Sequence, residues 1–388
     1  MKKNVKNESG YVLVFAMMMI ALIVLLTTRI ADLSSVHVSF AKVMIDREHA
    51  KMLAWSGANI AMAQLSLQED KKKGGEKAPK EPKGKMPQKV ATGWTEQEAK
   101  FFLKNIVPIL NEWQTFDIKK KDYGINGKIK IFISSEEGKV DLNRVFDFEK
   151  RKFFGQGKKK GDYQKILKEV FKGIQKEVKG KDLFNKVQDY LTKQQKFDQI
   201  LKNRQNRLYD TTEFFGIKNF DFPAENVFYQ PTLEIKGKKG KVGKNIYWTD
   251  VFTLWSGYKT INPWLLSNSM KNLTGLKFKG KISEKKKKIE SVLKQFKLNL
   301  SWPDDWNKIF SSLYGIKYKA LPDWAKQIMS TTFGPSVFSV VSYGTVGNIT
   351  QKLCIIFERK KVASGKKSDK KDSKEATIEF EIKKFYWI

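Results

Sequence analysis

The side chains suited to nucleophilic, acid–base or metal chemistry are few in this sequence and stand apart from one another. Cys354 is the only cysteine, so no intramolecular disulfide can form, and it lies in an apolar run that is typical of a core. His37 and His49 are about 120° apart around a helix, so they do not share a face. We find no catalytic, zinc or cofactor-binding residues to nominate, and we expect that the chain is not an enzyme.

One group of carboxylates comes closest to a cation site. Glu136, Glu137 and Asp141 follow a predicted strand at 128–133. Calcium requires several carboxylate and carbonyl oxygens, but the spacing of an EF-hand loop is missing here. We therefore interpret this segment as a solvated turn, with calcium binding as the alternative.

The overall charge is strongly positive. The 388 residues, enough for two folded parts, include 74 Lys and Arg against 41 Asp and Glu, a formal charge of +33. Such a balance favours either attraction to nucleic acid or anionic lipid, or a lysine-rich bias in solvated loops. The lysines gather in Gly- and Pro-bearing segments rather than along one helical face, which favours the loops, so no nucleic-acid partner is expected.

The N-terminus combines a basic start with an apolar helix. Three lysines precede Gly10, no charged residue occurs between Tyr11 and Thr28, and Arg29 ends the apolar run. About 18 apolar positions are close to the minimum for a membrane-spanning helix. A signal peptide would have a shorter apolar part followed by a small-residue cleavage site, which is missing here. The arrangement resembles a type IV prepilin leader, which is cut on the cytoplasmic side after the glycine so that the helix is retained.

Beyond Arg29 the apolar residues recur at intervals of three and four up to Leu65. No proline interrupts residues 11–67, which predicts one helix about 85 Å long, its first third in the membrane and the rest on a soluble domain. Residues 68–92 are rich in Lys, Pro and Gly, which predicts a flexible linker. A lipid-binding basic segment is the alternative.

The rest of the chain predicts helices between β-strands. A helix is expected at 96–110 and mainly helical structure at 145–330, interrupted by basic loops at 155–161, 236–244 and 279–288. Within it, 208–217 predicts a helix closed by Gly216 and belonging to a packing hairpin. Strands are expected at 337–347, 351–359 and 376–382, and they predict an antiparallel sheet against the long helix.

A weak internal echo links Gly138–Asn143 with Gly257–Asn262. Both copies are expected to lead from a strand edge or loop into a helix. In the second copy Asn262 and Pro263 predict a helix start, because Asn caps free N–H groups and Pro fits the first helical position.

Taken together, these features resemble the K-type minor pseudopilin of bacterial type II secretion systems (general secretion pathway protein K). The resemblance depends on four features: Gly10-Tyr11 at the leader junction; Phe15 where most pilin-like subunits have Glu; the turn with Gly138, Leu142 and Asn143 and its counterpart at Asn262-Pro263; and the closing pattern at 337–347.

The resemblance implies an α+β fold in which a pilin-like long N-terminal helix packs on an antiparallel sheet interrupted by a large, mainly helical insertion. The domains would be a leader (1–10), a transmembrane and spine helix (11–67), a basic linker (68–92), a pilin-like first part (93–143), the inserted helical domain (144–330) and the C-terminal strands (331–388). Prepilin peptidase would cleave after Gly10 and methylate Tyr11.

The implied function is that of a tip subunit of a periplasmic pseudopilus, held in the bacterial inner membrane by one helix with its N-terminus cytoplasmic. In such filaments each buried N-terminal amine needs an acceptor, and leaving it unpaired costs several kcal/mol. Phe15 cannot accept a hydrogen bond, which suits a subunit with none above it. The partners would be other minor pseudopilins, the major pseudopilin and the peptidase. Some relatives bind calcium, but the sequence identifies no ligands.

Two alternatives use the same anchor. A type IV pilus or DNA-uptake component would bind nucleic acid through the basic loops. A signal-anchored hydrolase is the other, although the sequence offers no residues for it.

Overall fold

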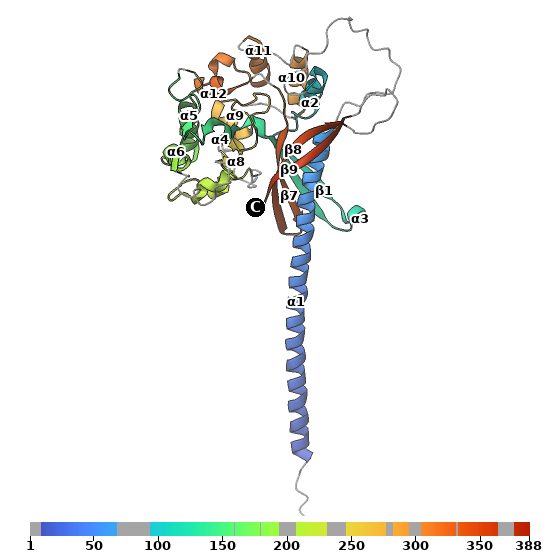
Figure 1. The fold of residues 1–388 in the computed structure, drawn as a ribbon. Coiled ribbons are helices and arrows are strands. Elements are labelled where there is room, and N and C mark those ends of the chain that lie inside the picture. Colours follow the sequence, from blue (N-terminus) through green and yellow to red (C-terminus); the bar gives the residue numbers. More distant parts are fainter. Residues whose placement is uncertain are drawn as a thin grey trace, which may run out of the picture.

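A computed structural model describes residues 9–67, 94–158, 160–178, 180–193, 207–230, 246–276, 282–294, 304–330, 333–363 and 376–388. The helix α1 (Ser9–Ser66) extends from a body made of a sheet and shorter helices (Figure 1). Its 58 residues span about 87 Å at 1.5 Å per residue. The single long helix predicted at 11–67 is therefore confirmed. The predicted linker at 68–92 lies outside the described residues.

The C-terminal part of α1 packs on the sheet through small side chains. The residues at three-and-four spacing that face the sheet are buried: Ala50, Leu53, Ala54, Ala58, Ala61 and Leu65. A Cβ added to Gly344 in the sheet would lie 2.1 Å from the carbonyl oxygen of Ala50, and one added to Gly57 would lie 2.1 Å from Oγ of Ser342. Glycine at both positions therefore lets the helix backbone lie directly on the sheet.

The sheet has five antiparallel strands in the order β1 (Trp113–Ile118), β2 (Gly127–Ser135), β7 (Val337–Val346), β8 (Ile349–Ala363) and β9 (Ala376–Trp387). The strands predicted at 128–133, 337–347, 351–359 and 376–382 all belong to it. With the long helix on one face and further helices elsewhere, the fold is mixed α+β. The predicted coarse class is confirmed.

The chain leaves the sheet after β2 and returns at β7, although these two strands are neighbours. Ser135 at the end of β2 pairs with Phe338 near the start of β7. Without residues 136–336 the five strands would follow one another as a simple meander. The intervening segment is thus inserted between two adjacent strands.

Short helices make up most of the described insertion. The α-helices are α4 (Leu142–Val145), α5 (Tyr163–Val178), α6 (Leu183–Lys193), α8 (Trp248–Val251), α9 (Asn268–Thr274), α10 (Ile282–Leu293), α11 (Asp304–Tyr314) and α12 (Asp323–Ile328). The 3₁₀ helices are η1 (Glu136–Gly138), η2 (Thr211–Gly216), η3 (Ala224–Asn226) and η4 (Tyr318–Ala320). Two-residue strands form a parallel pair, β3 (Val140–Asp141) with β6 (Phe252–Thr253), and an antiparallel pair, β4 (Phe146–Asp147) with β5 (Lys152–Phe153). The helices α2 (Glu96–Asn105) and α3 (Lys120–Tyr123) flank β1.

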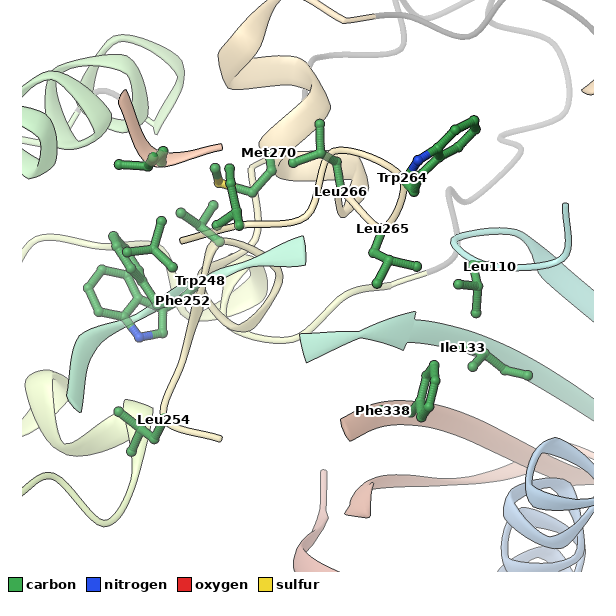
Figure 2. Packing of buried hydrophobic residues seen from close by; sticks show 14 of the residues in the cluster. Leu110, Ile133, Trp248, Phe252, Leu254, Trp264, Leu265, Leu266, Met270 and Phe338 are labelled. Carbon is green, nitrogen blue, oxygen red and sulfur yellow. The ribbon is translucent and has the colours of Figure 1, made fainter. Parts of the chain in front are cut away.

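One hydrophobic core continues from the sheet into the insertion. Figure 2 shows Leu110 and Leu265 above Ile133 of β2 and Phe338 of β7. Farther into the insertion, Trp248 is fully buried, with five phenylalanine rings centred between 4.7 and 5.6 Å from its own. The insertion and the sheet therefore stabilise each other.

Two predicted helices are shorter or tighter than expected. The predicted helix at 96–110 ends at Asn105, and turns follow it. The predicted helix at 208–217 is the 3₁₀ helix η2, in which Asp210 and Glu213 form a reciprocal capping box. No second α-helix follows η2 within 217–230, so the predicted hairpin is wrong.

Two further local predictions are wrong. Asn262 and Pro263 begin a turn rather than a helix: the Trp264 N–H donates to Oδ1 of Asn262, and α9 starts only at Asn268. The segment predicted as a basic loop at 279–288 contains the start of α10. The turn after Asn262 brings the carbonyl of Leu265 against Gly138, where an added Cβ would lie 1.9 Å from that oxygen. Tertiary packing thus overrides a local capping signal.

Candidate functional site

The N-terminal half of α1 is exposed on every side. All side chains from Tyr11 to Ile45 are exposed, including large apolar ones such as Val36 and Phe40, each 64% exposed. Among the described residues, α1 is the one helix long and apolar enough to cross a membrane, and its most apolar window is not buried at all. It fits a single membrane anchor by length and composition. A signal sequence satisfies the same criteria.

The predicted processing residues lie at the free end of this helix. Gly10 is the second residue of α1, and Tyr11 is 85% exposed. Phe15 is 62% exposed and lies one helical turn beyond Tyr11. The basic residues of the predicted leader are outside the described residues. The geometry therefore places residue 15 next to the amine that cleavage after Gly10 would create.

The carboxylates at 136–141 form a buried polar junction rather than a solvated turn. Glu136, Glu137 and Asp141 are each at most 3% exposed. One oxygen of Glu137 accepts hydrogen bonds from the Ser336 N–H (2.7 Å), the Ser336 hydroxyl (3.0 Å) and the Val337 N–H (2.9 Å). Its other oxygen accepts from the Ser135 hydroxyl at 2.5 Å. Glu137 therefore links the end of β2 to the start of β7. The prediction of a solvated turn is wrong.

A buried ion pair lies beside this junction. Lys139 Nζ is 2.5 Å from Oε1 of Glu136, and both side chains are at most 4% exposed. The same ammonium donates to the Ser339 hydroxyl in β7 at 2.9 Å. Not every lysine is thus in a solvated loop: Lys285 of α10 is also buried, and it donates to the carbonyl of Leu110 at 3.1 Å.

The two echoing segments meet in the structure. Asp141 accepts hydrogen bonds from the Gly257 N–H at 2.9 Å and the Ser256 hydroxyl at 3.1 Å. The Asn262 N–H donates to the carbonyl of Glu137 at 2.7 Å. Burial raises the pKa of Asp141 to about 6, although these hydrogen bonds oppose the rise. The junction is therefore formed by both copies.

The remaining predicted turn residues also lie at this junction. The Asn143 side chain makes two hydrogen bonds of 2.9 Å to the backbone of Leu208, and Leu142 is fully buried. Pro263 is buried next to Asn262. Gly138 allows the close backbone contact with Leu265 described above. Gly138 and Asn262 therefore lie where the two segments meet, whereas Asn143 connects the first segment to Leu208.

This junction does not fit a calcium site. The oxygens of Glu137 and Asp141 already accept hydrogen bonds from backbone N–H groups, which cannot coordinate a cation, and Glu136 faces an ammonium. Within the described ranges no group of three or more His, Cys, Asp or Glu side chains is arranged to hold a metal ion. Cys354 is buried as expected, and burial raises the pKa of its thiol to about 12.

A scan against models of protein families and a search of curated proteins both found no match to this chain.

Proposed function

We propose that this chain is a minor pseudopilin at the tip of a type II secretion pseudopilus, anchored in the inner membrane, where it helps to initiate assembly without catalysing a reaction. Support comes from the sequence resemblance and from α1, whose N-terminal half extends beyond the body formed by the sheet and the shorter helices. The partners would be the other pseudopilins and the prepilin peptidase. The body would lie in the periplasm.

The exposed length of α1 is the observation that carries the proposal. Residues 11–45 extend about 52 Å as a helix, whereas the hydrocarbon core of a bilayer is about 30 Å thick. A segment of roughly 15 residues would therefore emerge from the membrane with apolar side chains such as Phe40 still uncovered. Neighbouring apolar helices would remove this surface from water.

The charges of the emerging segment are compatible with packing against neighbouring apolar helices. Residues 29–48 carry three basic and three acidic side chains, whereas the whole chain has a formal charge of +33. This segment, called here the stalk (residues 29–48), has no net charge and exposes apolar side chains, so it favours other helices as partners over an acidic polymer. The segment proposed to bind partner helices is therefore not the part of the chain that carries the excess positive charge.

The tip position is supported by Phe15 and by the insertion. In a helical filament, the amine of Tyr11 would be adjacent to Phe15, which offers no acceptor for the amine of a subunit above. The insertion between β2 and β7 adds bulk to the body, which is accommodated most readily where no further subunit follows. Both features favour the end of the filament.

Identification of the N-terminal residue tests the proposed processing and membrane topology. Mass spectrometry of the membrane-bound protein should find Tyr11 as the methylated first residue. Replacing Gly10 with Leu should leave an uncleaved precursor. An intact leader on the unsubstituted protein would overturn the proposal.

Phe15 tests the tip position. Phe15→Glu should insert into the membrane normally but disturb initiation, because the new carboxylate would accept an additional subunit amine. Secretion by cells carrying this variant measures the effect, and Phe15→Leu is the matched control. Wild-type secretion from Phe15→Glu would contradict the tip position.

The charge of +33 supports a second candidate, a pilus or DNA-uptake component. Binding of DNA by the full chain, falling steeply between about 50 and 200 mM salt, would favour that function. No binding at about 50 mM salt would exclude it.

A further inference from the structure

The strand β9 carries an apolar strip on the same face of the sheet as α1. Phe385 pairs with Ile355 and Trp387 pairs with Leu353 across the β8–β9 ladder. Directly opposed residues point to the same face, and Leu353 and Ile355 belong to the core under α1. Yet Phe385 is 53% and Trp387 47% exposed. This strip therefore lies beside α1 without being covered by it.

One flank of α1 faces this strip. Gln64 of α1 makes a 2.7 Å hydrogen bond to Gln114 of β1, which fixes the flank that faces the β1 edge. Trp55 precedes Gln64 by nine residues, about 180° around the helix, so it faces the β9 edge. Trp55 is 38% exposed. The exposed apolar side chains of this flank and of the strand are together called here the β9 groove: Trp55, Ile382, Phe385 and Trp387.

Three charged side chains of β9 form ion pairs, mostly with residues of other segments: Lys384 lies 3.3 Å from Asp210. Lys383 lies 2.9 Å from Glu358 of β8 and 2.8 Å from Glu381, and Glu381 also pairs with Lys360. The β9 groove is thus an apolar surface without an unbalanced charge from these residues. A partner would match it with apolar side chains.

The dimensions of the groove fit a helix. α1 lies against β7 at Gly344, and β9 is two strands away, about 9.6 Å at a spacing of about 4.8 Å. Packed helices lie about 8–10 Å apart. A second helix beside α1 would therefore rest on β9. Addition of a strand is disfavoured, because the register shift opposite Ile356 and Phe357 makes the β9 edge irregular.

We propose that the β9 groove binds the spine helix of a neighbouring single-pass subunit, with the aromatic side chains as its main contacts. Large aromatic residues dominate the energy of protein interfaces, and three of the four groove residues are aromatic. The proposal depends on the proposed function, since it assigns a place to one of the helices of that assembly.

Photo-crosslinking in native membranes tests the occupant. The full chain would carry benzoylphenylalanine in place of Phe385, with Tyr123 of α3, 68% exposed at the opposite end of the sheet, as the matched control position. The expected product joins position 385 to a peptide from the helix of another anchored subunit, outside its membrane span. A crosslink to a strand, to lipid or to a second copy of this chain would overturn the proposal, as would a yield no higher than at position 123.

A double variant tests the strength of the contact. Phe385→Asp with Trp387→Asp should reduce the neighbouring subunit that co-purifies with the chain at least tenfold, while Tyr123→Asp should not. If the double variant melts at a lower temperature than the wild type, Phe385→Ala with Trp387→Ala replaces it. Normal co-purification with either folded variant would refute the groove. If Tyr11 is the first residue and partners co-purify, such a failure concerns the groove alone and leaves the proposed function intact.

Discussion

The two halves of α1 differ in whether their apolar side chains are buried by the rest of the chain. From Ala50 to Leu65 the helix lies on its own sheet, largely through alanines, which are fully buried. From Tyr11 to Ile45 the helix carries larger apolar residues that no part of the described chain covers. Stability is therefore decided within the body, whereas on the proposed function lipid and other chains would cover the exposed half. Substitutions in the body should change unfolding, and those in the exposed half should change association.

Loss of the buried ion pair should have the largest effect on stability. Lys139→Met leaves Glu136 as an unpaired buried charge, which should lower the free energy of unfolding by about 3–5 kcal/mol. Denaturant unfolding of the detergent-solubilised chain measures this. The control is Lys51→Met, because Lys51 pairs with Glu48 at the same sequence spacing on the helix, where both side chains are partly exposed. This control should lose less than about 1 kcal/mol. Equal losses would contradict the contrast.

The junction should also give a pH dependence. Burial raises the pKa of Asp141 from 3.8 to about 6, so the folded state binds this proton more tightly than the unfolded state. The resulting stabilisation is complete below about pH 4 and is lost as the pH rises through 6, a fall of about 3 kcal/mol. Burial raises the pKa of Glu137 and Asp250 as well, in the same direction. Asp141→Asn should make the dependence between pH 4 and 7 shallower, since Glu137 and Asp250 remain, and an unchanged slope in denaturation curves would refute the assignment.

The close approach of α1 to the sheet predicts a smaller loss. Gly344→Ala places a Cβ about 2 Å from backbone atoms of α1, which should force the helix away and cost about 2 kcal/mol. In the exposed half, Ala41→Val adds bulk without touching the body and should change the free energy of unfolding by less than about 0.5 kcal/mol. Thermal unfolding followed by tryptophan fluorescence distinguishes them. A tolerated Gly344→Ala would mean that the contact is looser than described.

The smallest effect on stability is expected in the stalk. Phe40→Asp should change the free energy of unfolding by less than about 0.5 kcal/mol, because Phe40 is 64% exposed. The same variant should lose most of its co-purifying membrane partners, since a carboxylate would enter an apolar helical interface. Lys42→Asp, on the same stalk but already polar, serves as the control. Loss of fold in Phe40→Asp would show that the body does contact this half.

Apolar periodicity was sufficient to predict α1 and the strands β2, β7, β8 and β9, because each pattern depends on neighbours three to four or two residues away; β1 was not predicted. The polar junction was not predictable in this way. Glu137 bonds Ser336 across 199 residues, and Asp141 bonds Gly257 across 116, so the local sequence of acidic residues resembles a solvated turn. The helix expected at Asn262-Pro263 failed for the same reason. The β9 groove also escaped prediction, since nothing in the sequence relates Trp55 to Trp387.

The insertion between β2 and β7 determines the order in which the molecule can be completed. A chain synthesised from its N-terminus releases α1 first and then β1 and β2, while β7 and β8, which also support the alanine face of α1, come after residue 336. Until then part of the sheet-facing side of α1 stays uncovered. On the proposed function, prematurely ended products would thus be membrane-anchored yet incomplete, with the uncovered part of α1 open to proteases. Completion of the C-terminal strands is what separates a finished subunit from such a fragment.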